Sequence, residues 1–308
     1  CDMITMANGS DYGGSLRTPA SFCGVTGYRP SPGIVPAVDS TVSLNPFSVQ
    51  GPMGKNVKDT FLLLQAQSDI NPNDPFSSLN AISLPDNLLE TDISSVKMAY
   101  SSDLGCAPVD TEIKKIFYKK IETIKSSFKT AINDHPNFLD IHNCFEVIRG
   151  FNYVSSHGQK YENHKKLLGS NLIDNVERGL LYNIKDLAWA HTEQTSIFKN
   201  FRKFFEDFDV LICPSASVSP YPHTKLFVDE INDEKMPTYM RWLALSYAPT
   251  MALPCAWSLP CGLDHLNMPF GMQLIAPAGN DAKLSEIAIA LENVLNSNNE
   301  TKRPRPKI

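Results

Sequence analysis

The feature that most constrains this chain is a glycine-rich stretch near its start, residues 9–27, which reads GSDYGGSLRTPASFCGVTG. Gly13 and Gly14 carry no Cβ, so the backbone there can turn through conformations closed to other residues, and successive N–H groups can point into one concavity. Such a concavity suits an oxyanion, and Ser15 follows it directly. The pattern predicts an acyl-transfer site, in which amide donors stabilise the charge that develops on a carbonyl oxygen.

Two residues of opposite charge, Asp11 and Arg17, flank this loop. We expect them to form an ion pair that holds the loop in shape. A surface pair of little consequence is the alternative, since exposed ion pairs contribute little to stability.

The stretch closely resembles the second half of the amidase signature, the pattern that names a family of serine hydrolases. The resemblance continues at residues 29–33 (RPSPG) and 49–53 (VQGPM), and again at residues 208–214 (FDVLICP) and 268–275 (MPFGMQLI). It spans nearly the whole chain and is weakest over residues 94–201. Strands that alternate with helices indicate an α/β protein. The resemblance sharpens this expectation to a large mixed β-sheet covered by helices on both faces.

The resemblance also implies roles for individual residues. Ser15 is the expected nucleophile, and Asp11 and Arg17 belong to the scaffold of the loop. Ser10 is expected to support the hydrogen-bond network around the nucleophile, with a simple turn hydroxyl as the alternative. The implied oxyanion donors are the backbone N–H groups of Tyr12, Gly13, Gly14 and Ser15.

One part of the family pattern has no match in this sequence. Family members use a Ser–Ser–Lys triad, in which a lysine and a serine within a Gly-Gly-Ser-Ser-Gly-Gly element precede the nucleophile. The chain opens at Cys1 and contains no Gly-Gly-Ser-Ser-Gly-Gly. We therefore expect an N-terminally incomplete amidase that is inactive by itself, and whose first partner is the missing N-terminal segment, in the same or a separate chain.

Composition excludes several classes of function. The net charge is −5 and no basic region is concentrated enough to indicate nucleic-acid binding. Apolar runs fall far short of the roughly 18 residues that suggest a membrane span. The seven cysteines and seven histidines are scattered without metal-ligand spacing, so neither a metal nor another cofactor is expected. Free thiols favour a reducing compartment, and we expect a cytoplasmic protein.

Apolar spacing and caps predict the main elements. Helices are expected from residue 56, after Asp110, over most of residues 146–205 and over residues 281–295. Strands are expected at residues 96–100, 138–141, 208–213 and 270–276. Residues 29–54 are expected to be an irregular connection across the surface of the core. All 308 residues form one domain in this prediction, with the nucleophile loop and the connection in residues 1–55 and a helical layer near the cleft at about residues 101–205.

The predicted function is hydrolysis of a small-molecule amide through an acyl-enzyme on Ser15. Residues 30–36, PSPGIVP, look more like general amidases than like the transamidating group. Two alternatives stay open, the A subunit of a tRNA-dependent amidotransferase and a catalytically dead fragment or pseudoenzyme. A weaker alternative takes Cys1 as the nucleophile of an N-terminal nucleophile hydrolase, which leaves the signature unexplained. A homodimer also stays open.

Overall fold

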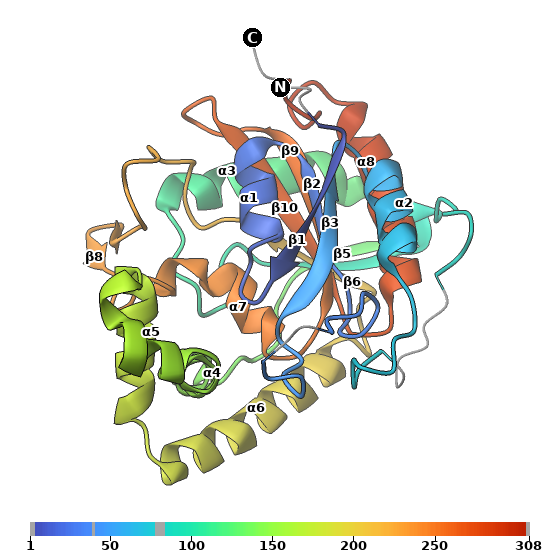
Figure 1. The fold of residues 1–308 in the computed structure, drawn as a ribbon. Helices are drawn as coiled ribbons and strands as arrows, with labels where there is room; N and C mark the ends of the chain where they lie inside the picture. The colour runs from blue at the N-terminus through green and yellow to red at the C-terminus, as the bar shows by residue number, and fades with distance from the viewer. Residues whose placement is uncertain (1–3, 39–40, 78–83, 306–308) are drawn as a thin grey trace.

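The computed structural model describes residues 4–38, 41–77 and 84–305, so Cys1 lies outside the described residues. Its centre is an eight-stranded mixed sheet in the order β1-β3-β2-β9-β10-β6-β4-β5 (Figure 1). The strands of this sheet are β1 (Met6–Asp11), β2 (Thr26–Arg29), β3 (Val49–Gly54), β4 (Lys97–Tyr100), β5 (Thr130–Asn133), β6 (Val210–Pro214), β9 (Cys255–Leu263) and β10 (Pro269–Ala276). A short hairpin, β7 (Glu230–Ile231) and β8 (Glu234–Lys235), stands apart from it.

Helices cover both faces of the sheet, as the sequence predicted. The helices are α1 (Arg17–Cys23), α2 (Val57–Gln67), α3 (Thr111–Ile124), α4 (Ile141–His164), α5 (Ser170–Leu181), α6 (Ile184–Phe204), α7 (Ala244–Thr250) and α8 (Asp281–Asn296). Two adjacent residues of β2 show the arrangement, because successive residues of a strand point to opposite faces. A Cβ on Gly27 would lie 2.8 Å from Ala20 of α1, whereas the Tyr28 hydroxyl donates to Asp281 of α8 at 2.6 Å.

The helices with clear local signals begin where the sequence predicted. The side chain of Asn56 accepts a hydrogen bond from Asp59 N and starts α2. The side chain of Asp110 accepts hydrogen bonds from two backbone N–H groups and starts α3. The apolar stripe of α3 is buried, including Ile113 and Phe117. These elements are predictable because a cap and a periodic apolar face act within a few residues of sequence.

One predicted strand is wrong. Residues 138–140 have no regular structure, Leu139 has a left-handed backbone (φ 52°), and Ile141 is the first residue of α4. The strand in this part of the chain is β5, which pairs in parallel with β4. β5 lies at the edge of the sheet and is mostly exposed, so it lacks the apolar alternation that marks a buried strand.

The prediction of an irregular surface connection over residues 29–54 is also wrong in part. β3 lies inside this range and pairs with β1 on one side and β2 on the other. Residues 29–35 are buried. The glycines and proline of β3 disguise it, because both residue types are depleted in strands. β1, β2 and β9 are further strands that were not predicted from the sequence.

A helical layer lies beside the sheet and not across it (Figure 1). It consists of α4, α5 and α6, and α4 contacts both of the others. The α4–α5 crossing is close, since a Cβ on Gly150 would lie 2.8 Å from the Cα of Gly179. Residues 101–205 also include α3 and β5. β5 is a strand of the sheet, and α3 packs on the sheet at β6.

Candidate active site

The candidate nucleophile lies on the turn between β1 and α1. Gly14 has φ 125°, a conformation that L-residues rarely adopt, and a Cβ there would lie 2.7 Å from the Cβ of Ser246. Its carbonyl oxygen accepts hydrogen bonds from the N–H groups of Arg17 (2.9 Å) and Thr18 (2.8 Å), which begin the helix. Ser15 is exposed, and its hydroxyl has no hydrogen-bond partner among the residues that the structure describes. The turn thus presents this hydroxyl outward.

The Asp11 carboxylate organises the turn from inside. It is fully buried and accepts hydrogen bonds from the backbone N–H groups of Gly14 (2.8 Å) and Leu16 (3.2 Å). Arg17 donates to it through Nε and Nη2, both at 2.9 Å, so the expected ion pair is present and buried. Burial alone would raise the pKa of Asp11, but Arg17, Arg29 and the Gly14 N–H together hold it well below its usual range.

One of the predicted oxyanion donors already has a hydrogen-bond acceptor in this structure. The Gly14 N–H donates to the buried Asp11 carboxylate at 2.8 Å and therefore points into the inner side of the turn. Its use as an oxyanion donor would require that bond to break, and a charge-assisted bond of this kind is among the stronger ones. The N–H groups of Tyr12, Gly13 and Ser15 stay predicted donors.

Arg17 ties the turn to the far end of the sequence. Its Nη1 donates to the carbonyl oxygen of Ser246 (3.0 Å) and to Oε1 of Gln273 (3.2 Å), and its Nη2 donates to Oγ1 of Thr250 (3.0 Å). These partners lie in α7 and β10. None of the three was predicted from the sequence, and no local pattern could have revealed them because each lies more than 200 positions away.

The side chain of Tyr12 joins the turn to the helical layer. Its hydroxyl accepts a hydrogen bond from Asn152 of α4 (2.8 Å), and its ring packs near Phe145. The guanidinium of Arg149, also on α4, lies 5.5 Å from the centre of the ring. Burial raises the pKa of Tyr12 to about 12, so the phenol stays neutral. These contacts of the Tyr12 side chain were not predicted from the sequence, which indicated only a role for its backbone N–H.

The remaining predicted residue, Ser10, lies on β1 opposite Gln50 and is exposed. Its supporting role stays a prediction.

Within residues 4–38, 41–77 and 84–305, no group of three or more histidine, cysteine, aspartate or glutamate side chains is arranged to hold a metal ion. In the same part of the chain, no helix is long and apolar enough to cross a membrane.

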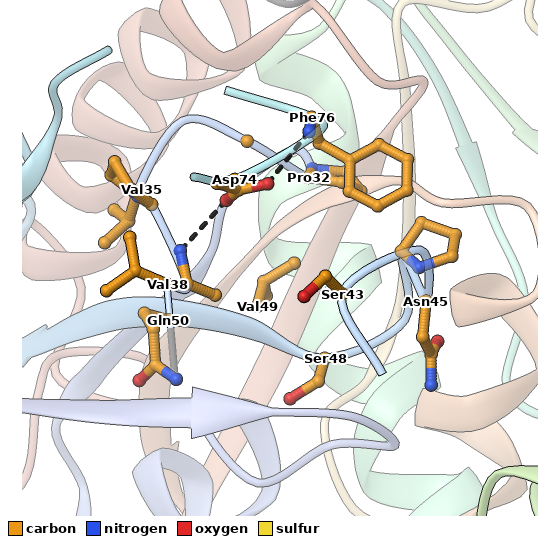
Figure 2. Close-up of a pocket in the computed structure, with 14 residues that line it drawn as sticks. Pro32, Val35, Val38, Ser43, Asn45, Ser48, Val49, Gln50, Asp74 and Phe76 are labelled. Carbon is orange, nitrogen blue, oxygen red and sulfur yellow. Dashed lines mark hydrogen bonds between the residues drawn. The ribbon is translucent and has the colours of Figure 1, made fainter. Parts of the chain in front are cut away.

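A cavity of about 340 Å³, whose lining does not include Ser15, lies between residues 32–38, residues 43–50 and the turn at residues 74–76 (Figure 2). Its lining includes one carboxylate, Asp74. Both oxygens of this carboxylate accept backbone N–H groups, from Ala37 at 2.9 Å and from Phe76 at 2.8 Å. Asp74 therefore holds two loops together, and no catalytic group of the candidate site reaches this cavity.

The mixed sheet with helices on both faces makes this an α/β protein, and the serine turn between β1 and α1 is its candidate site. The family model described as Amidase matches residues 1–284, and the chain belongs to this amidase signature family. This is the family whose signature residues 9–27 resemble.

Among curated relatives, the chain is 27% identical to the A subunit of the glutamyl-tRNA(Gln) amidotransferase of Gloeothece citriformis, over 93% of this chain and 63% of that protein. It is 28% identical to the corresponding protein of Trichodesmium erythraeum, over 94% of this chain and 64% of that protein. The chain thus spans less than two thirds of the length of these relatives.

Solved structures share the fold. A bacterial aryl acylamidase of the amidase signature family superimposes with a TM-score of 0.82 at 20% identity, over 94% of this chain and 62% of that one. The A subunit of the Thermotoga maritima glutamyl-tRNA(Gln) amidotransferase gives a TM-score of 0.71 at 23% identity, over 99% and 66%. These likenesses establish the large mixed sheet with its helical covers.

Proposed function

We propose that the protein is an amide hydrolase that forms an acyl-enzyme on Ser15. The observation that carries this proposal is the exposed Ser15 hydroxyl on a turn whose shape is fixed by the buried Asp11–Arg17 pair. A fixed turn of this kind keeps its N–H groups oriented before the substrate arrives, which is the condition for effective stabilisation of an oxyanion.

In the proposed reaction, Ser15 Oγ forms a bond to the amide carbonyl carbon and gives its proton to a base. The carbonyl oxygen becomes an oxyanion, for which the N–H groups of Tyr12, Gly13 and Ser15 are the donors. When this intermediate collapses, the C–N bond breaks and the nitrogen takes the proton as the amine leaves. Water then attacks the ester, releases the acid and restores the serine.

The base is the part of the mechanism that these residues do not supply. The family resemblance implies a neutral lysine that acts through a second serine, and a lysine can act as a base only if burial lowers its pKa. We propose that these two groups come from a segment outside the 308 residues. The observation that favours this is that the chain covers only 63% and 64% of the length of the two curated relatives.

A fluorophosphonate probe tests the nucleophile, because it reacts covalently with activated serines. We expect labelling of the native protein at Ser15, identified by peptide mass spectrometry, and loss of both labelling and amidase activity in Ser15→Ala. Ser155→Ala is the control, since Ser155 is an exposed serine of α4 with no assigned role in the candidate site, and this variant should still be labelled at Ser15. Undiminished labelling of Ser15→Ala would refute the assignment.

A second candidate is the A subunit of a tRNA-dependent amidotransferase, which the 27–28% identity to proteins of that name favours. This function needs a further protein to deliver aminoacyl-tRNA. Purification of the native protein with its bound partners, followed by an assay for glutamine-dependent amidation of Glu-tRNA(Gln), distinguishes the two. Hydrolysis of small amides without a partner supports the amidase, and a pseudoenzyme would show neither activity.

We further propose a cytoplasmic location and a small-molecule amide as substrate. The six cysteines within the described residues are free thiols, which suits a reducing compartment. Cell fractionation tests the location, and light scattering of the purified protein tests for the homodimer that the sequence left open.

A further inference from the structure

Arg29, the last residue of β2, is a buried cation directly behind the serine turn. It is fully buried, and its Nη1 donates to the backbone carbonyl oxygen of Asp11 at 2.6 Å and to that of Phe47 at 3.0 Å. A third, longer bond of 3.3 Å reaches Oδ1 of Asp11. Burial lowers the pKa of Arg29 to about 10, so the guanidinium still carries its charge at neutral pH.

The bond to the Asp11 carbonyl matters because of the peptide group to which that carbonyl belongs. The same peptide group carries the N–H of Tyr12, one of the predicted oxyanion donors. A hydrogen bond to a peptide oxygen polarises the whole group and strengthens its N–H as a donor, and a charged donor does this more strongly than a neutral one.

The Gly14–Ser15 peptide has a related arrangement without a charged side chain. Its carbonyl oxygen accepts the N–H groups of Arg17 and Thr18 in the first turn of α1, and its N–H belongs to Ser15. Two predicted oxyanion donors therefore belong to peptides whose carbonyl oxygens are held from behind, and Arg29 holds one of them.

The charge of Arg29 is not cancelled locally. The cluster holds two guanidinium groups, Arg17 and Arg29, against one carboxylate, Asp11, and all three side chains are fully buried. Nε and Nη2 of Arg29 have no hydrogen-bond acceptor among the described residues. The cluster thus carries an excess positive charge in a region of low dielectric constant, where charges act over a longer range than in water.

We propose that Arg29 is a positioning residue for the reaction, which polarises the Asp11–Tyr12 peptide so that the Tyr12 N–H stabilises the oxyanion formed by attack of Ser15. This inference rests on the proposed function. It assigns to Arg29 a contribution that appears when charge develops on the substrate, and therefore affects the rate of the chemical step more than substrate binding.

A trifluoromethyl ketone inhibitor tests this directly, because its hemiketal adduct with Ser15 carries the oxyanion and its ionisation can be followed by fluorine NMR. In Arg29→Gln we expect the pKa of the adduct to rise by about one unit or more, with kcat lowered about tenfold or more and KM nearly unchanged. Arg29→Lys, which keeps the charge, should recover part of both effects.

Arg149→Lys is the matched control, because it alters another buried arginine beside Tyr12 that makes no bond to the Asp11–Tyr12 peptide. It should leave the pKa of the adduct unchanged. An unchanged adduct pKa in a folded Arg29→Gln protein overturns the proposal. If that variant does not fold, the chemical shift of the Tyr12 amide nitrogen in the wild-type protein is measured instead. Polarisation of the peptide should move this resonance downfield. An ordinary chemical shift contradicts the proposal. Absence of any wild-type adduct at Ser15 would instead refute the proposed function.

Discussion

The serine turn and the helical layer lie next to each other but are held together in opposite ways. In the turn, the charged groups are fully buried and bonded to backbone, as in the Asp11–Arg17 pair. In the layer, the pair Arg178–Asp174 leaves 45% and 44% of its side chains exposed, and Leu167 and Leu181 are also exposed. The difference indicates that the geometry of the turn is fixed by the body of the protein, whereas the surface of the layer can vary without disturbing it.

The largest effect should follow from removing the buried carboxylate. Asp11→Asn leaves Arg17 and Arg29 buried without a countercharge, and we expect a loss of about 3–5 kcal/mol in the free energy of unfolding. Asp174→Asn in the helical layer should lower it by less than about 1 kcal/mol, because water screens that exposed pair. Urea unfolding of both variants measures the contrast, and equal losses would break the comparison.

The same carboxylate gives the turn an acid-sensitive component. The pKa of Asp11 is lower in the folded protein than in the unfolded chain. Its contribution to stability is therefore complete above the unfolded value of about 4 and is lost as pH falls below it. Unfolding curves at falling pH should show this loss in the wild type and not in Asp11→Asn.

Two glycines sharpen the comparison at the level of the backbone. Gly14→Ala forces a left-handed residue against Ser246, and we expect a loss of roughly 1–3 kcal/mol together with reduced probe labelling of Ser15. Gly169 precedes α5 with φ −68°, and a Cβ there meets nothing within 4 Å. Gly169→Ala should leave stability and labelling nearly unchanged. Thermal unfolding and labelling rates check both, and tolerance of alanine at Gly14 would contradict the strained turn.

The smallest effect is expected at the junction between the helical layer and α7, the helix that accepts hydrogen bonds from Arg17 of the turn. Nε2 of His142, on α4, must donate to the Cys106 carbonyl at 3.0 Å, so Nδ1 accepts from the Tyr247 hydroxyl of α7 at 2.5 Å. Burial, followed by the nearby Arg241, lowers the pKa of His142. The neutral ring therefore stabilises the junction above the unfolded value of about 6.5, and this stabilisation is lost as pH falls below it.

His142→Gln should reduce the change in unfolding free energy between pH 7 and pH 5, because glutamine can donate and accept without titrating. His191→Gln, at an exposed position on α6, should leave that change as it is. Urea unfolding at the two pH values measures both variants. An identical pH dependence in wild type and His142→Gln would show that the junction does not depend on the neutral ring.

The sequence predicted the parts of the molecule that depend on local physics. The cap at Asp110 and the apolar stripe that follows it identify α3, and the buried run at residues 208–213 identifies β6. β3 was missed because its glycines and proline suppress the pattern of a strand, and its two neighbours supply its pairing. The strand predicted at residues 138–141 is wrong because Leu139 has a left-handed backbone, and no sequence pattern indicated this conformation.

The same limit applies to the candidate site. The pairing of Asp11 with Arg17 was predictable because the two residues lie six positions apart around a turn. Arg29 joins them through a strand pairing that the sequence did not reveal, and Gln273 reaches Arg17 from β10. Long-range partners of this kind depend on the topology of the sheet, which the missed strands concealed.

The distance in sequence between Arg17 and its partners has a consequence for biosynthesis. Ser246, Thr250 and Gln273 are 229, 233 and 256 residues downstream. At about 5–20 residues per second, the ribosome needs on the order of tens of seconds to make the last of them after Arg17. During that time the Arg17 guanidinium lacks its native hydrogen-bond acceptors outside the turn. The nascent protein should therefore acquire a reactive serine late, and a ribosome stalled before Gln273 should display a chain that the serine probe cannot label.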